Sequence, residues 1–148
     1  MDELIAFARA RLDDDEAAAK AAAEQARYDE WDAVGDRTDD EIGRSNWRVV
    51  GVALMETHPG AMASAQHIAR HDPARALRDV AAKRAILELH KPQPKPGYGN
   101  DLPRCLACLS ARDRWQEDWQ ADPWPCRTVR LLAAVWDGHP DYRQEWAP

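Results

Sequence analysis

The residues best suited to chemistry lie in one segment, RCLACLSARDRWQEDWQADPWPC, which covers residues 104–126 and holds all three cysteines of the chain. Cys105 and Cys108 form a C-x2-C pair, the spacing that lets two thiolates of one tight loop bind the same metal ion at about 2.3 Å. Cys126 follows Pro125 and lies where the last helix should begin, so the amides and dipole of that helix should lower the pKa of its thiol. The three thiols therefore predict a zinc site.

Two other interpretations of the cysteines stay open. Cys126 lies at helical spacing from Val129 and Ala133, which is also typical of an inert, buried thiol that behaves as a small hydrophobic side chain. A redox-active pair is less favoured, because this C-x-x-C follows a proline-rich stretch and lacks the strand-then-helix setting of thioredoxin-like enzymes. The odd number of cysteines argues against a disulfide framework.

A tetrahedral zinc site needs a fourth ligand, and the chain has no fourth cysteine. His90 is the first candidate, because it ends a predicted helix and the proline-rich connector after it could fold back to bring the cysteines beside it. His139, just after the last helix, is the second candidate. With neither, a water would complete the site, as in catalytic zinc enzymes. We predict a closed structural site, with no catalytic residue, whose metal ligands are Cys105, Cys108, Cys126 and His90.

Tryptophan is the second unusual feature, since the chain has seven tryptophans. Three of them lie among arginines next to the cysteines. Tryptophan and arginine are favoured at interface hot spots, and tryptophan also stacks on bases and cations. A protein partner is our main expectation, nucleic acid is the alternative, and a third interpretation makes these side chains the core of a small zinc subdomain. The predicted partner-binding residues are Trp115, Trp119, Trp124, Arg112, Arg114, Arg127 and Arg130.

The usual enzyme signatures are absent from the sequence. His67 and His71 have i,i+4 spacing, but no Glu follows His67 as the HExxH motif requires, and the Asp72-Pro73 helix break should separate the two rings. No serine lies in a nucleophile-elbow context, and the glycines form no phosphate-binding loop. We therefore expect no enzymatic activity, with a zinc hydrolase that keeps an open coordination position as the alternative.

The segments that must position these residues are mostly helical. Residues 1–28 predict an acidic helix whose apolar positions follow a three-to-four spacing. Residues 29–46 predict an acidic connection with a helical turn around Trp31. WRVVGVALM, at residues 47–55, is the best strand candidate because it is rich in valine. Together these segments predict a mostly α fold with a small β element near residues 47–55.

The second half of the chain continues this pattern. A short helix is expected over 61–70. The clearest helix start follows, where Asp72 can accept from first-turn amides and Pro73 occupies the first helical position. This helix should run to about His90 and be apolar on two sides, because Leu89 and Ile86 lie away from its main face. The strand and this central helix make up residues 47–90, a proline-rich connector follows at 91–103, and a Cys/Trp-rich zinc subdomain occupies 104–148.

The length and charge of the chain limit the class of protein to which it can belong. The chain has 148 residues and fits a single domain, 1–148, whose C-terminal subdomain is stapled by zinc. Residues 1–42 carry fourteen acidic side chains against five basic ones, whereas the rest carries twelve against fifteen. No stretch approaches the roughly eighteen apolar residues of a membrane span, and the acidic start does not resemble a signal peptide. We expect a soluble cytoplasmic protein with no membrane partner.

Three stretches carry a family resemblance: HIARHDPARALRDVAAKRAILELH at 67–90, PCRTVRLLAAVW at 125–136 and HPDYRQEWAP at 139–148. With the opening DELIAFARARL, they resemble a family of small proteins from actinobacteria and their phages, catalogued only as a domain of unknown function. The resemblance implies a helix-ending histidine, two cysteines and a Pro-Cys before the last helix, and a bacterial or phage cytosolic setting. It implies no activity, and the sequence departs from the family at 29–46 and at 115–124.

Overall fold

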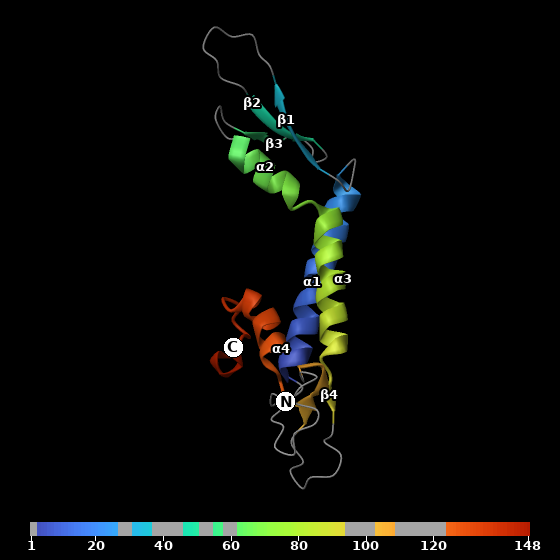
Figure 1. Ribbon diagram of the computed structural model, residues 1–148. Coiled ribbons are helices and arrows are strands. Elements are labelled where there is room, and N and C mark those ends of the chain that lie inside the picture. The colour runs from blue at the N-terminus through green and yellow to red at the C-terminus, as the bar shows by residue number, and fades with distance from the viewer. Residues whose placement is uncertain are drawn as a thin grey trace. The chain divides into compact units, whose positions relative to one another are not determined.

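Figure 1 shows the computed structural model of the chain, which describes residues 3–26, 31–36, 46–50, 55–57, 62–93, 103–108 and 124–148. Helices dominate the described residues, so the expected mostly helical fold with a small β element is confirmed. None of the described helices combines the length and the hydrophobicity that crossing a bilayer requires. The α-helices of the described residues are α1 (Glu3–Gln25), α2 (Met62–Arg70), α3 (Pro73–Leu89) and α4 (Arg127–Ala133).

The chain divides into two compact units. The first unit comprises Met1–Asp13 and Ala81–Pro148, and the second comprises Asp14–Val80. The boundary falls inside α1 and inside α3, so each of these helices contributes one half to each unit. All of the predicted metal ligands fall in the first unit.

A small antiparallel sheet forms much of the second unit. Its strands lie in the order β1 (Asp32–Asp36), β2 (Asn46–Val50) and β3 (Met55–Thr57), and α2 contacts all three. Val49 of β2 and Ala65 of α2 are buried, which gives this unit its own core.

Two expectations for this sheet are wrong in detail. Residues 47–55 do not form one strand: Val49 pairs with Met55, so the chain reverses direction between β2 and β3. The connection expected at 29–46 contains strand β1 rather than a helical turn near Trp31. Its sequence, DAVGD, is too polar to predict a strand. The strand forms nevertheless, because an edge strand is held by backbone hydrogen bonds to its neighbour and needs no apolar pattern.

Helix α3 begins as the sequence predicts. The backbone N–H of Arg75 donates to Oδ1 of Asp72 over 2.6 Å, and the N–H of Ala76 donates to the Asp72 carbonyl over 3.0 Å. The helix was expected to be apolar and buried on two sides, but only one side is buried. Val80 and Leu87 are buried, whereas Leu89 is 69% exposed. Helix α3 therefore buries one face and leaves the other in solvent.

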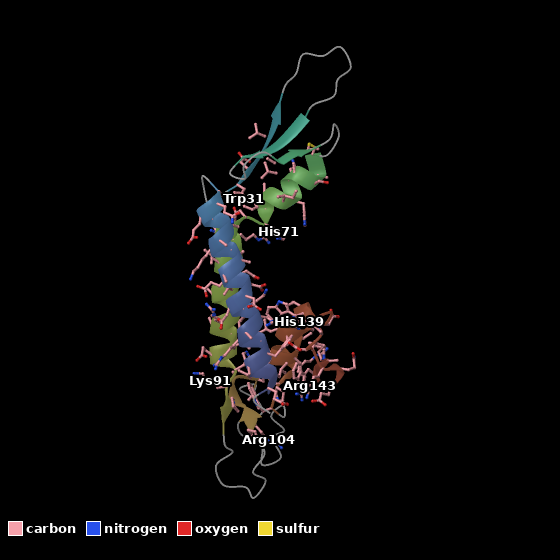
Figure 2. The ribbon with its side chains drawn as sticks, turned by 180° about the vertical axis from the view of Figure 1, so that it is seen from behind. Trp31, His71, Lys91, Arg104, His139 and Arg143 are labelled. Carbon is pink, nitrogen blue, oxygen red and sulfur yellow. The ribbon has the colours of Figure 1, made fainter. Side chains whose placement is uncertain are left out.

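The first unit is held by the start of α1 and the C-terminal segment. The predicted stripe of Leu4, Ile5, Ala8 and Leu12 is buried except at Ile5, which is only partly buried. Rings of the C-terminal segment surround Phe7, whose centroid lies 5.3 Å from that of Trp146. Arg143, labelled in Figure 2, donates to both carboxylate oxygens of Glu3 over 2.7 and 2.9 Å. This aromatic and ionic contact fixes the C-terminal segment on α1.

The first-turn hydrogen bond of α3 gives a direct test of the helix start. Asp72→Ala removes the side-chain acceptor of the Arg75 amide, so the free energy of unfolding should fall by about 1 kcal/mol. Asp72→Asn retains an acceptor and should stay close to the wild type. Urea unfolding followed by circular dichroism measures both variants, and equal losses for alanine and asparagine would contradict a capping role.

Candidate metal centre

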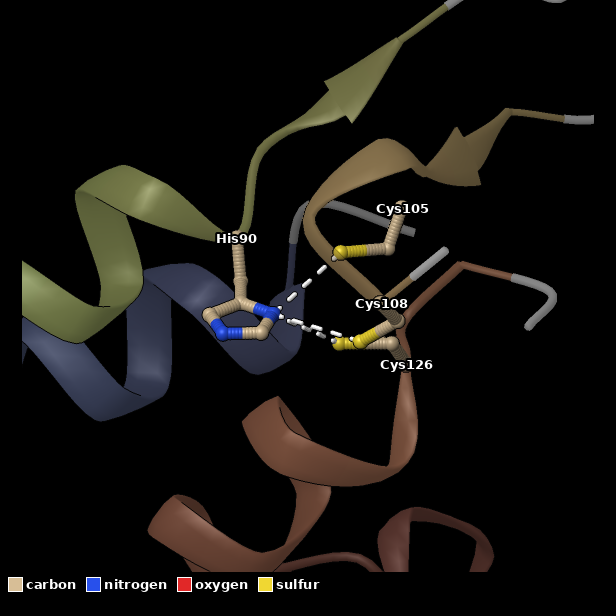
Figure 3. A group of neighbouring side chains, drawn as sticks. All are labelled: His90, Cys105, Cys108 and Cys126. Carbon is tan, nitrogen blue, oxygen red and sulfur yellow. Dashed lines mark hydrogen bonds between the residues drawn. The ribbon is translucent and has the colours of Figure 1, made fainter. Parts of the chain in front are cut away.

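Four side chains from three segments meet just beyond the end of α3. They are His90, Cys105, Cys108 and Cys126, whose ligand atoms all lie within 4.8 Å of one another. Figure 3 shows the three sulfurs facing one edge of the imidazole ring. Nδ1 of His90 lies 3.3 Å from Sγ of Cys105, 3.4 Å from that of Cys108 and 3.6 Å from that of Cys126.

These distances match the edges of a tetrahedral zinc site. With Zn–N near 2.0 Å and Zn–S near 2.3 Å, tetrahedral angles place the nitrogen about 3.5 Å from each sulfur. The three observed separations lie on both sides of that value. The donor set of three thiols and one imidazole is one of the common structural zinc sets. The group therefore fits a metal ion both in chemistry and in spacing.

A pair of very short strands brings Cys105 to His90. His90 follows the last turn of α3, where its N–H donates to the Ile86 carbonyl over 3.0 Å. Strand β4 (Pro92–Gln93) then pairs with β5 (Arg104–Cys105), which sets Pro92 opposite Cys105. The expectation that the cysteines lie beside His90 is confirmed.

The second cysteine of the pair follows directly from the first. Residues Leu106–Cys108 form the 3-10 helix η1, whose tight turn directs Cys108 to the same side as Cys105. Sγ of Cys108 also lies 3.9 Å from Oγ1 of Thr128. Thr128 was not among the predicted site residues, although its place two residues after Cys126 was a usable signal.

Cys126 is positioned by the start of α4. The N–H of Trp124 donates to the Pro103 carbonyl over 3.1 Å, which ties the chain before Cys126 to the strand that holds Cys105. The Arg130 side chain donates through Nε to the Pro125 carbonyl over 3.1 Å. Through Nη1 it also donates to the carbonyls of Glu145 and Ala147, over 3.2 and 3.3 Å. Arg130 thus links the turn before Cys126 to the C-terminal segment.

Burial controls the protonation of two of the thiols. Burial, together with the neighbouring thiols of Cys126 and Cys105, raises the pKa of Cys108 to about 12. Burial also raises the pKa of Cys126, and the backbone N–H of Val129 only partly opposes this. The expectation that the helix start lowers the Cys126 pKa is therefore wrong for the metal-free group, because desolvation outweighs the helix amides. A bound cation would favour the thiolates and so lower the pKa values of both cysteines.

The other histidines of the described residues lie elsewhere. His139 packs against α1, where its ring contacts Phe7 and Arg11, and its Nδ1 accepts from the Asp141 N–H over 3.1 Å. It therefore stands apart from the ligand group. The rings of His67 and His71 lie 4.5 Å apart, so the expectation that they separate is wrong. Within the described part of the chain, neither joins a metal-ligand group.

The predicted partner-binding surface is only partly described. Trp124 is 6% exposed, so its assignment to an accessible surface is wrong, and it belongs to the core around the metal ligands. Arg130 is engaged in the three backbone contacts above, whereas Arg127 is exposed. The remaining members, Arg112, Arg114, Trp115 and Trp119, lie outside the described residues.

The raised thiol pKa values predict proton release on metal binding. Cys108 and Cys126 are protonated near neutral pH in the metal-free protein, and a metal binds only their thiolates. Adding zinc to weakly buffered metal-free protein at pH 7.5 should therefore release roughly two or more protons per ion, measured with a pH indicator. Cys108→Ser should release one proton fewer. Zinc uptake without acidification would contradict thiolate ligation.

The chain was also compared with known proteins. No match was found among curated proteins or among solved structures. A family model described as Family of unknown function (DUF6221) matches residues 1–148. Because the match spans the full sequence, the chain belongs to this family of unknown function.

Proposed function

We propose that this protein is a small zinc-binding protein that acts without catalysis, by binding a partner protein. The observation that carries the proposal is the group of three thiols and one imidazole at tetrahedral spacing. Thiolate-rich tetrahedral sites favour zinc over the hard cations magnesium and calcium, which prefer oxygen ligands. The setting that we propose is the cytoplasm of an actinobacterium or of its phage-infected cell.

The number of protein ligands supports a structural site rather than a hydrolytic one. His90 and the three cysteines supply four donors, which fill a tetrahedron. A zinc hydrolase needs a position for water, and this donor set leaves none. The ligands also come from three segments that are separated in the sequence, which is typical of sites whose metal contributes to folding.

The order of the ligands along the chain connects the metal to the proposed partner surface. Cys108 and Cys126 flank residues 109–125, so a metal bound by both thiols holds the two ends of this segment together. The segment carries Trp115 and Trp119, which are typical interface anchors, together with Arg112 and Arg114. Holding both ends restricts the free conformations of the segment, which lowers the entropy cost of binding. A nucleic acid that uses the same side chains is the alternative occupant.

Metal counting by native mass spectrometry tests the zinc site. The wild-type protein should carry one zinc ion per chain. His90→Ala removes a ligand and should lower zinc affinity by about 100-fold or more, whereas His139→Ala, the matched control, should retain the metal. Chelation should also lower the thermal stability of the wild type. A metal-free protein with unchanged heat resistance in the presence of chelator would contradict the site.

Substitution of the tryptophans tests the partner surface. Trp115→Ala and Trp119→Ala should each weaken capture of the partner by tenfold or more, since truncation of a hot-spot residue costs about 2 kcal/mol. Leu131→Ala is the control, because Leu131 is an exposed apolar residue of α4 outside the segment. Capture from lysate followed by affinity measurement on the purified partner gives the result, with zinc content checked for each variant. Unchanged affinity in both tryptophan variants would remove this surface from the proposal.

A further inference from the structure

Beside the metal ligands, the first unit contains a hollow of about 420 Å³. It is lined by the start of α1, by the last turn of α3 with the residues just after it, and by Trp124. This volume lies within the range of small-molecule sites, about 300–1,000 Å³. The hollow shares His90 with the metal-ligand group but contains none of the cysteines.

Most of the wall of the hollow is apolar. Ile5 of α1 and Leu87 of α3 supply aliphatic side chains, and Pro92 and Trp124 complete the wall. Leu87 and Trp124 are buried, so the backs of these side chains pack into the core of the unit. A ligand that fills this space must therefore present an aliphatic or aromatic body.

Two cations and one carboxylate form the polar part of the lining and its edge. Nη2 of Arg9 donates to Oε1 of Glu88 over 2.8 Å, and Nζ of Lys91 contacts Oε2 of the same carboxylate. Both cations line the hollow, and Glu88 does not. The two positive charges share a single negative one, so this group retains a net positive charge and can accept a second carboxylate.

The ring of His90 offers a further donor. Its Nδ1 faces the three sulfurs and its Nε2 lies on the side of the ring away from them (Figure 3), and His90 is one of the residues that line the hollow. Among the described residues, Nε2 has no hydrogen-bond partner. With Nδ1 bound to a metal, Nε2 carries the proton, and such histidines almost always donate it to a carboxylate, a carbonyl or water.

We propose that this hollow binds a small monocarboxylic acid with an apolar body. The carboxylate of the ligand accepts from the Nε2–H of His90 and pairs with Arg9 and Lys91, while the body packs on the apolar wall. A free acid fits better than a peptide, because the remaining lining residues offer only one side-chain hydrogen-bond donor, the indole N–H of Trp124, and no acceptor for the amides of a peptide backbone. The assignment rests on the proposed zinc site, which sets the proton on Nε2 of His90, but it does not rest on Trp115 or Trp119 of the proposed partner surface.

A calorimetric titration of the zinc-loaded full chain tests this assignment. The probe is 4-phenylbutyrate, and 4-phenylbutyramide is the matched ligand that lacks the charge. The acid should bind at least about tenfold more tightly than the amide, because hydrogen bonds to a charged group are the stronger ones. Equal affinity of the two compounds, or no binding of the acid at millimolar concentration, would overturn the proposal.

A double variant tests the two cations. Arg9→Gln with Lys91→Gln should weaken binding of the acid by about tenfold or more and leave binding of the amide unchanged. The fold should persist, because exposed ion pairs contribute little to stability, and zinc content verifies this. Arg78→Gln with Lys20→Gln is the control pair, since both residues lie outside the hollow. Unchanged binding of the acid in the Arg9/Lys91 variant would overturn the assignment.

Cobalt substitution reports on the His90 contact. In the Co(II)-loaded protein the acid should shift the visible ligand-field bands, because the hydrogen bond at Nε2 changes the basicity of Nδ1. The amide should leave the spectrum unchanged. A peptide that binds where the free acid does not would identify a partner anchor and overturn the small-ligand assignment. Since the partner assay uses Trp115 and Trp119, failure of one proposal is distinguishable from failure of the other.

Discussion

Three sulfurs packed against one imidazole nitrogen set the main physical constraint on the first unit. Cys105 and Cys126 are almost completely buried, and burial raises the pKa of Cys126 and of Cys108. Without a cation the thiols of Cys108 and Cys126 remain neutral and contribute only weak hydrogen bonds. A divalent cation bound by the same four side chains would join three segments through four strong bonds. These segments are otherwise joined mainly by short strands and a few backbone contacts.

The contacts around α4 show why this geometry can exist before a metal binds. Arg130 reaches from α4 to the carbonyl before Cys126 and to two carbonyls of the C-terminal segment. That segment is itself held on α1 by Phe7 and by the Arg143–Glu3 pair. The acidic N-terminal part of the chain attracts the more basic remainder at this point, because Glu3 of α1 pairs with Arg143 near the C-terminus. The position of Cys126 therefore depends on residues at both ends of the chain.

His90 connects the metal-ligand group to the proposed ligand site. One ring nitrogen faces the sulfurs, and the other is available to the hollow between α1 and the end of α3. A carboxylate at Nε2 would make the imidazole a stronger donor to the metal, so occupancy of the hollow and metal affinity are coupled in the same direction. The coupling passes through a single ring and needs no change in the fold.

Local features of the structure follow directly from the sequence. The start of α3 at Asp72 and Pro73, the buried stripe of α1 and the start of α4 after Cys126 all depend on residues close together in the chain. The ligand set was also within reach, because few residue types bind zinc and the chain offers only three cysteines. The residues that start a helix and the residue types that bind zinc can be recognised from a few neighbouring positions. A single sequence is therefore enough to find both.

Only the tertiary structure decided the features that depend on distant partners. It placed His90, rather than His139, beside the three cysteines, because the pairing of Pro92 with Cys105 brings β5 next to the end of α3. It buried Trp124, divided residues 47–55 between two strands and made a strand of the polar residues 32–36. Strand pairing and burial are set by which segments meet in space, and composition along a single segment does not encode that choice.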